Sequence, residues 1–115
     1  MTALTYLDLT SIVETGLAAT TAEAIIKNAI RELNAKLKKH NQELSNLTGT
    51  AGSMTVNLEE AEIGAVIKVA KSIYFRDYKG PTQVTVGSIS YSTQRVEDVV
   101  AECARDLLDA DVSFG

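Results

Sequence analysis

The stretch that decides the fold is residues 20–37, TTAEAIIKNAIRELNAKL. Its apolar residues recur at steps of three and four from Ala22 to Leu37, which is the period of one face of an α-helix. Thr20 and Glu23 form the sequence pattern of a capping box at the start of this helix. The helix is expected to end near His40-Asn41, and at about 1.5 Å per residue it spans roughly 30 Å, the long axis of a small domain.

Two further stretches show the same helical period. One follows Asn57, a candidate helix cap, and ends before Gly80-Pro81. The other follows Ser92 or Thr93, either of which can cap it, and its apolar stripe runs from Val96 to Leu108. Gly64 interrupts the first of them and indicates either close packing on the helix over residues 20–37 or a contact between subunits. With a shorter helix over residues 3–15, the sequence predicts a mainly α fold. This is one domain, residues 1–115, built as a small bundle of three long amphipathic helices plus a short N-terminal helix.

Two extended segments are expected to project from this bundle, over residues 45–57 and 80–92, and residues 109–115 are expected to form a C-terminal tail. The first is rich in Gly, Ser and Thr, which predicts a mobile loop. The second alternates apolar and polar residues and shifts phase at a Gly-Ser pair, which predicts a β-strand with a bulge. A lone strand needs a partner, either Met54–Val56 of the same chain or an edge in another chain. The candidate assembly residues are therefore Val84, Val86, Gly87, Ile89, Tyr91, Met54, Val56, Tyr78 and Phe114.

The charge distribution argues against a nucleic-acid-binding face. The net charge is −4, and residues 92–115 account for all of it, with two arginines against six carboxylates. A nucleic-acid binder concentrates basic residues instead. The basic cluster from Lys36 to His40 lies at a predicted helix end, where it complements the helix dipole or serves as an interaction patch.

Catalytic chemistry has few candidate residues. The chain has one cysteine and one histidine, so a multi-thiolate zinc site and most histidine-based sites are excluded. Cys103 lies within an apolar helical stripe and is expected to act as a small core residue, while His40 is expected at the surface. We therefore expect no enzyme, no cofactor and no bound metal. The most apolar stretch is interrupted by Lys68 and Lys71, so no membrane span is expected.

The order of these features resembles a known family. Residues 62–78, EIGAVIKVAKSIYFRDY, are followed by a short linker, by residues 84–92, VTVGSISYS, and by a terminal helix. This pattern is similar to the small head–tail connector, or adaptor, proteins of tailed bacteriophages and tailed archaeal viruses. The likeness covers about residues 3–108 and includes no catalytic signature. Members of that family often begin with a longer acidic helical segment, which this chain lacks.

The resemblance implies a structural protein of the virion, made in the host cytoplasm and located at the head–tail interface. Such proteins form a ring, commonly of twelve subunits, beneath the portal protein. The ring extends the DNA channel, through which DNA passes without specific binding, and it receives stopper or tail-completion proteins. An alternative of another class is a small non-catalytic helical adaptor or regulatory module that binds a partner peptide or helix. That alternative predicts a monomer or dimer with an exposed apolar groove.

Overall fold

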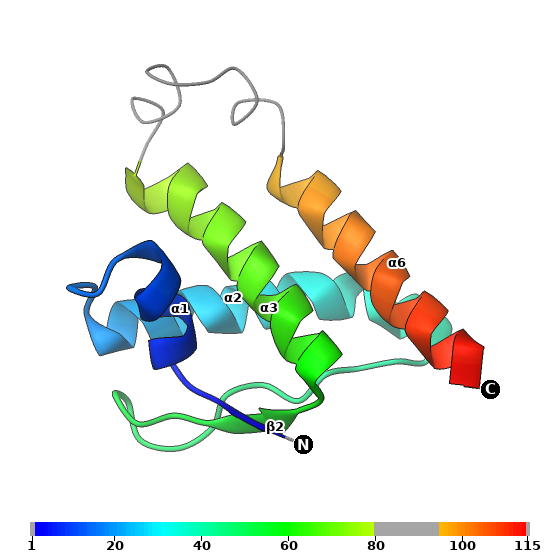
Figure 1. The fold of residues 1–115 in the computed structure, drawn as a ribbon, viewed down its shortest axis with the longest axis horizontal. Helices are drawn as coiled ribbons and strands as arrows, with labels where there is room; N and C mark the ends of the chain where they lie inside the picture. Colours follow the sequence, from blue (N-terminus) through cyan, green and yellow to red (C-terminus); the bar gives the residue numbers. More distant parts are fainter. Residues whose placement is uncertain (1, 80–94, 115) are drawn as a thin grey trace.

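The computed structural model describes the backbone of residues 2–79 and 95–114, and the side chains of residues 2–77 and 95–108. Figure 1 shows how the described helices and strands are arranged. In chain order they are β1 (Thr2–Leu4), α1 (Leu7–Val13), α2 (Ala19–Leu37), η1 (Lys38–His40), β2 (Val56–Leu58), α3 (Glu60–Tyr74), η2 (Phe75–Lys79) and α6 (Val96–Phe114). The mainly α fold predicted from the sequence is confirmed.

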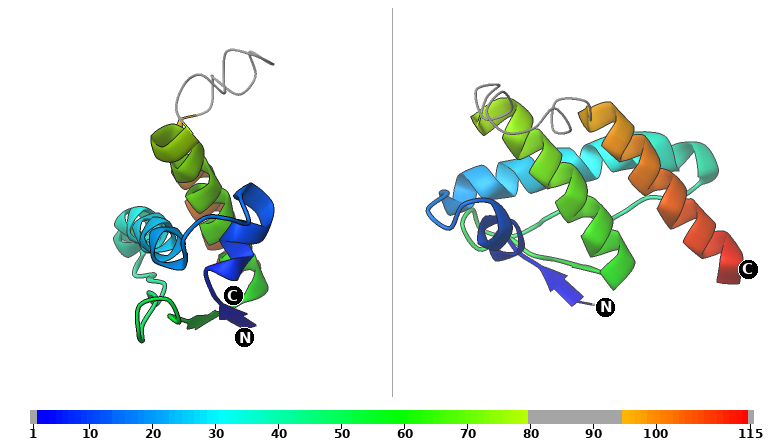
Figure 2. Two further views of the ribbon diagram at one scale, coloured as in Figure 1. Left: turned by 90° about the vertical axis from the view of Figure 1, so that its left-hand side faces the viewer. Right: turned by 45° about the horizontal axis from the view of Figure 1, so that its top comes forward.

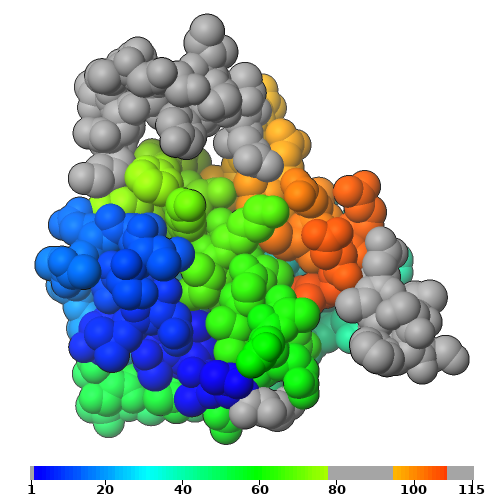
Figure 3. Space-filling model, in the orientation of Figure 1, coloured from blue at the N-terminus to red at the C-terminus, as the bar shows by residue number. Residues whose placement is uncertain are grey.

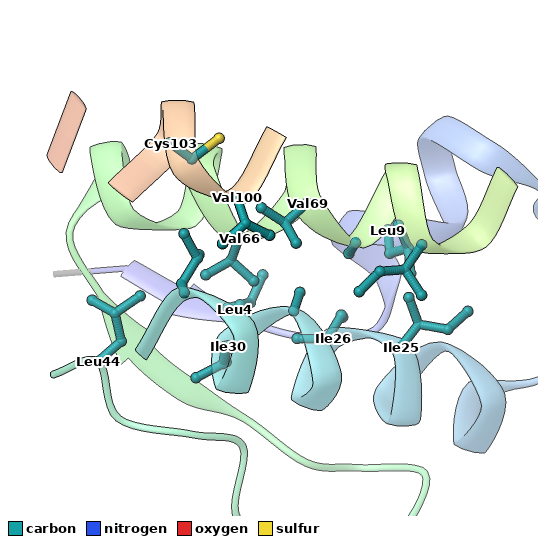
Figure 4. Close-up of a cluster of buried hydrophobic side chains, with 14 of the residues drawn as sticks. Leu4, Leu9, Ile25, Ile26, Ile30, Leu44, Val66, Val69, Val100 and Cys103 are labelled. Carbon is teal, nitrogen blue, oxygen red and sulfur yellow. The ribbon is translucent and has the colours of Figure 1, made fainter. Parts of the chain in front are cut away.

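The long helices form two layers. α3 and α6 lie side by side and run in opposite directions, and α2 crosses behind both of them (Figures 1 and 2). α1 covers the side where α2 and α3 meet. Figure 4 shows the core between the layers, where Val66 of α3 and Val100 of α6 lie on the sides of their helices that face α2. The apolar stripes that the sequence predicts are therefore the surfaces on which the helices pack, and each buried aliphatic side chain contributes about 1.5–3 kcal/mol.

The start of α2 differs from the prediction. Its N-cap is Ala18, and Thr20 lies inside the first turn without capping it. The capping box is wrong because Glu23 turns away from the helix start: it is only 3% exposed, and its carboxylate accepts two hydrogen bonds from a distant loop. Two charge-assisted bonds to backbone N–H groups outweigh the single local bond of a capping box.

α3 begins two residues later than expected. Asn57 lies in β2, and the N-cap is Glu59, which forms a capping box with Glu62. The backbone N–H of Glu59 donates to Glu62 Oε1 at 2.9 Å. Gly64 is exposed, and a Cβ placed on it meets no atom within 4 Å. The predicted close packing of Gly64 on the second helix is therefore wrong.

Residues 45–57 do not project. Leu47 and Val56 are buried in the core, and Thr48 pairs with Thr55 in an isolated antiparallel bridge. The apolar residues at both ends of the loop hold it against the bundle, which its polar middle does not reveal. β2 begins within this stretch, at Val56, and pairs with β1. Because residues 2–4 form β1, the N-terminal helix spans Leu7–Val13 and is shorter than the predicted 3–15.

The two ends of the α3–α6 pair complete the comparison. The third helical stretch runs as predicted up to residue 79, as α3 to Tyr74 and then as a π-helical turn, η2, to Lys79. The predicted stop at Gly80-Pro81 lies outside the described residues. The backbone of α6 is helical through Phe114, so the prediction of a separate tail from residue 109 is wrong up to Phe114. The segment 80–92 lies outside the described residues.

Candidate assembly surface

The predicted assembly residues fall into three groups in the structure. Five of them lie outside the described residues, namely Val84, Val86, Gly87, Ile89 and Tyr91. The backbones of Tyr78 and Phe114 lie at the ends of η2 and α6, which are at opposite ends of the bundle (Figure 1).

The third group, Met54 and Val56, belongs to the interior. Val56 is buried and pairs with Leu4 of β1, so its backbone is already engaged. Met54 is half-buried and packs against the core. Val56 therefore does not offer a free strand to another subunit, and its assignment as an assembly residue is corrected. Pairing of Met54–Val56 with residues 84–91, which lie outside the described residues, stays a prediction, and β1 already occupies one side of β2.

Two polar side chains on one face of α2 hold the returning chain in place. Glu23 accepts the backbone N–H of Gly52 at 2.7 Å and that of Met54 at 2.9 Å. Asn34, three helical turns later, donates to the Leu44 carbonyl at 3.0 Å and accepts the Leu44 N–H at 2.7 Å. These four hydrogen bonds give partners to backbone groups of Leu44, Gly52 and Met54, which lie outside any helix or strand.

The end of α3 carries a second long-range polar contact. The Tyr74 hydroxyl donates to Glu14 Oε1 at 2.5 Å, which joins the end of α1 to the last turn of α3. The hydrogen bond to Glu14, together with burial of the ring, raises the pKa of Tyr74 to about 12. Phe75 packs edge-on against Tyr74, with ring centroids 5.3 Å apart, and is 39% exposed. Of these two adjacent aromatic residues, Tyr74 belongs to the core and Phe75 is exposed.

Charged groups next to Phe75 are paired with each other. The Arg76 guanidinium donates to both carboxylate oxygens of Asp77, at 2.7 and 2.9 Å. This bidentate pair lowers the pKa of Asp77 and raises that of Arg76, because each charge stabilises the other. Both side chains are about half exposed, so the contribution of the pair to stability is small.

Other candidate chemistry is sparse in the described residues. Cys103 is 3% exposed, and burial raises the pKa of its thiol, as expected for a core cysteine. His40 lies exposed in η1. Among the described residues no group of three or more His, Cys, Asp or Glu side chains is close enough to hold a metal ion.

A shallow groove lies on the outer face of α2. It has a volume of about 580 Å³ and is lined by Arg31, Asn34, Ala35, Lys38, Glu43, Leu44, Ser45 and Asn46. Lys38 and Glu43 form an exposed ion pair of 3.5 Å across it. Most of these side chains are polar, so the groove does not offer the apolar surface that a buried partner helix needs.

Comparison of the chain with protein-family models, with curated proteins and with solved structures finds no match. In the part of the chain that the structure describes, no helix combines the length and apolar character needed to cross a membrane.

Sequence reasoning missed the contacts that join distant parts of the chain. Glu23 and Gly52 are 29 residues apart, and Glu14 and Tyr74 are 60 apart. The one local signal is that Glu23 falls beside the apolar stripe of α2, where a charged side chain needs a partner.

Proposed function

We propose that this protein is a head–tail adaptor of a tailed virus, a structural subunit that forms a ring beneath the portal protein. Twelve subunits is the number that the resemblance favours. The ring extends the DNA channel and receives a stopper or tail-completion protein, and the subunit carries out no catalysis.

The observation that supports this proposal is where the described chain stops and resumes on either side of residues 80–94. η2 ends at Lys79 and α6 begins at Val96, and both lie at the same end of the bundle (Figure 1). The fifteen residues 80–94 therefore leave and re-enter the subunit at one end. The strongest β-strand pattern in the sequence lies within this segment and, if extended, would find backbone partners in another molecule.

Charge gives further support. The described part of α6 carries Glu97, Asp98, Glu102 and Asp106 against a single arginine, Arg105. A conduit for DNA works best when its wall does not capture phosphates, and an acidic balance weakens that attraction.

The alternative, a module that binds a peptide or helix, has one observation in its favour. Leu7 and Ile12 of α1 are 58% and 50% exposed, which is unusual for large aliphatic side chains. They flank the outer face of a seven-residue helix, which gives little area for a partner.

The native mass of the assembly separates the two functions. The purified protein is measured by native mass spectrometry and negative-stain microscopy, alone and mixed with the portal protein of the virus that encodes it. The adaptor function predicts a closed ring with a central channel, alone or on the portal. A monomer or dimer that never binds the portal contradicts it and favours the alternative.

A further inference from the structure

β1 is an edge strand with one open side. Figure 3 shows the N-terminal residues, in dark blue, at the surface beside the green segment of β2 and early α3. β1 pairs only with β2 among the described residues, and Ala3 is exposed. The antiparallel register joins Thr2 to Leu58, Ala3 to Asn57 and Leu4 to Val56.

The hydrogen-bonding phase of this ladder follows from its last pair. In an antiparallel ladder, pairs that exchange N–H···O bonds alternate with pairs that do not. If Leu4 and Val56 were a pair without such bonds, the next residues, Thr5 and Thr55, would have to bond each other.

Thr5 and Thr55 are both engaged elsewhere. Thr55 exchanges both of its backbone bonds with Thr48, at 3.0 and 3.1 Å. The N–H of Thr5 donates to Asp8 Oδ2 at 2.9 Å. The pairs that exchange backbone hydrogen bonds are therefore Thr2 with Leu58 and Leu4 with Val56. Ala3 lies between them, so its N–H and C=O point away from β2.

We propose that the open edge of β1 accepts the segment Val84–Tyr91 of a second copy of this chain, which adds a third strand to the sheet. This inference rests on the proposed ring and names one of its subunit contacts. An edge strand with unpaired N–H and C=O groups is a template for pairing with another chain. The alternating sequence of residues 84–91 predicts a strand, and such a strand would need a template of this kind.

The subunit's own segment cannot occupy this edge. β1 lies beside the start of α3, whereas residues 80–94 leave from Lys79, beyond the far end of α3 (Figure 1). At about 1.5 Å per residue, α3 and η2 together are roughly 28 Å long. The chain from Lys79 to Arg95 reaches at most about 55 Å when fully extended, so a return trip of twice 28 Å leaves no residues to lie along the edge.

This contact joins different surfaces of the two copies. The far end of one subunit supplies the strand, and the near end of the next supplies the edge. Such a heterologous contact generates a ring when the rotation between neighbours closes. Asp8 limits the contact, because its bond to Thr5 covers the edge beyond Ala3.

A proline at position 3 tests the edge. Ala3→Pro removes an N–H that β2 does not use, and proline is tolerated at edges whose N–H faces outward. Ala3→Val is the matched control, since it keeps the N–H and suits a strand. We expect Ala3→Pro to keep the wild-type circular dichroism and lose the ring by native mass spectrometry, while Ala3→Val keeps both. Rings formed normally by Ala3→Pro overturn the inference and leave the ring itself intact.

Cysteine pairing separates contacts within one chain from contacts between chains. In a Cys103→Ala background, one chain carries Ala3→Cys and a second carries a cysteine at Val84, Val86 or Ile89 in turn. After mixing and oxidation we expect a disulfide-linked dimer that contains one chain of each kind. A chain with both substitutions that closes its own disulfide as a monomer overturns the inference. A wild-type protein that never assembles contradicts the proposed function as well.

Discussion

The carboxylate of Glu23 accepts the backbone N–H of Gly52 at 2.7 Å, and the two residues are 29 positions apart. The same carboxylate accepts the N–H of Met54 at 2.9 Å. A buried carboxylate is stabilised only when its oxygens are bonded, so helix and loop depend on each other. This pair determines whether residues 45–57 are a free loop or part of the subunit.

Substitution of Glu23 should release this loop. Glu23→Ala is expected to lower the free energy of unfolding by about 2–3 kcal/mol, because two charge-assisted bonds are lost. Glu23→Gln keeps one acceptor oxygen and should lower it by less. Urea unfolding gives both values, and amide hydrogen exchange at Gly52 and Met54 should become faster in Glu23→Ala.

Glu32→Gln is the matched control, since Glu32 is an exposed carboxylate on the same helix. We expect it to change stability by no more than about 0.5 kcal/mol. Unchanged exchange at Gly52 and Met54 in Glu23→Ala would show that the loop does not depend on this carboxylate.

The helices could be predicted from the sequence because apolar residues at steps of three and four mark the face on which a helix packs. The stripe from Ala22 to Leu37 repeats at three and four residues, and tertiary packing uses that same stripe. The start of α2 could not be predicted, because Glu23 has a plausible local role and a stronger distant one. β1 is only three residues long, and such a strand has no periodicity to detect.

The prediction of the assembly site was wrong for Val56, which pairs within the subunit. Val56 belongs to a stretch in which apolar and polar residues alternate. This alternation is the same for a strand that pairs within the subunit and for one that pairs with another chain. The open edge of Ala3 follows from the bonding phase of a ladder, which depends on the contacts of Thr55 and Thr5. Sequence patterns carry no information of that kind.

Gly64 should tolerate alanine in the isolated subunit. It lies exposed within α3, and an added Cβ meets no atom within 4 Å. Because glycine costs a helix about 1 kcal/mol relative to alanine, Gly64→Ala should raise the free energy of unfolding by about that amount. Gly52→Ala makes the contrast, since Gly52 has a φ of +91° and alanine there should destabilise the protein.

The assembly of Gly64→Ala tests the other interpretation of this glycine. A variant that is more stable but fails to form rings would place a neighbouring subunit close to the α3 backbone. Normal ring formation would exclude that contact. Denaturant unfolding and native mass spectrometry on the same sample answer both questions.

Tyr74 should make stability fall at alkaline pH. Its hydroxyl donates to Glu14, and its pKa is raised from 10.0 to about 12. Between these two values the folded protein holds a proton that the unfolded chain has released, so the free energy of unfolding decreases as pH rises. A shift of two pKa units corresponds to at most about 3 kcal/mol, fully present below pH 10 and lost by about pH 12.

Tyr74→Phe removes this dependence. It should lower stability by about 0.5–1.5 kcal/mol at pH 7, from the lost hydrogen bond, and should flatten the decline between pH 10 and 12. Tyr6→Phe is the matched control and should keep the wild-type slope. Urea unfolding at a series of pH values measures all three proteins. An unchanged slope in Tyr74→Phe would assign the decline to other groups.

The segment Val84–Tyr91 is tested directly by Val86→Pro. Proline removes one ladder donor and fixes φ, so the segment could no longer serve as a continuous strand. The core that the described residues form between α2, α3 and α6 is built from residues outside this segment. We expect Val86→Pro to keep its helical circular dichroism and its unfolding midpoint but to form no rings and no virions. Val86→Ala keeps the donor and is expected to assemble. A subunit that unfolds on the proline substitution would place the segment in its own core, and normal assembly would show that the ring is held by other contacts.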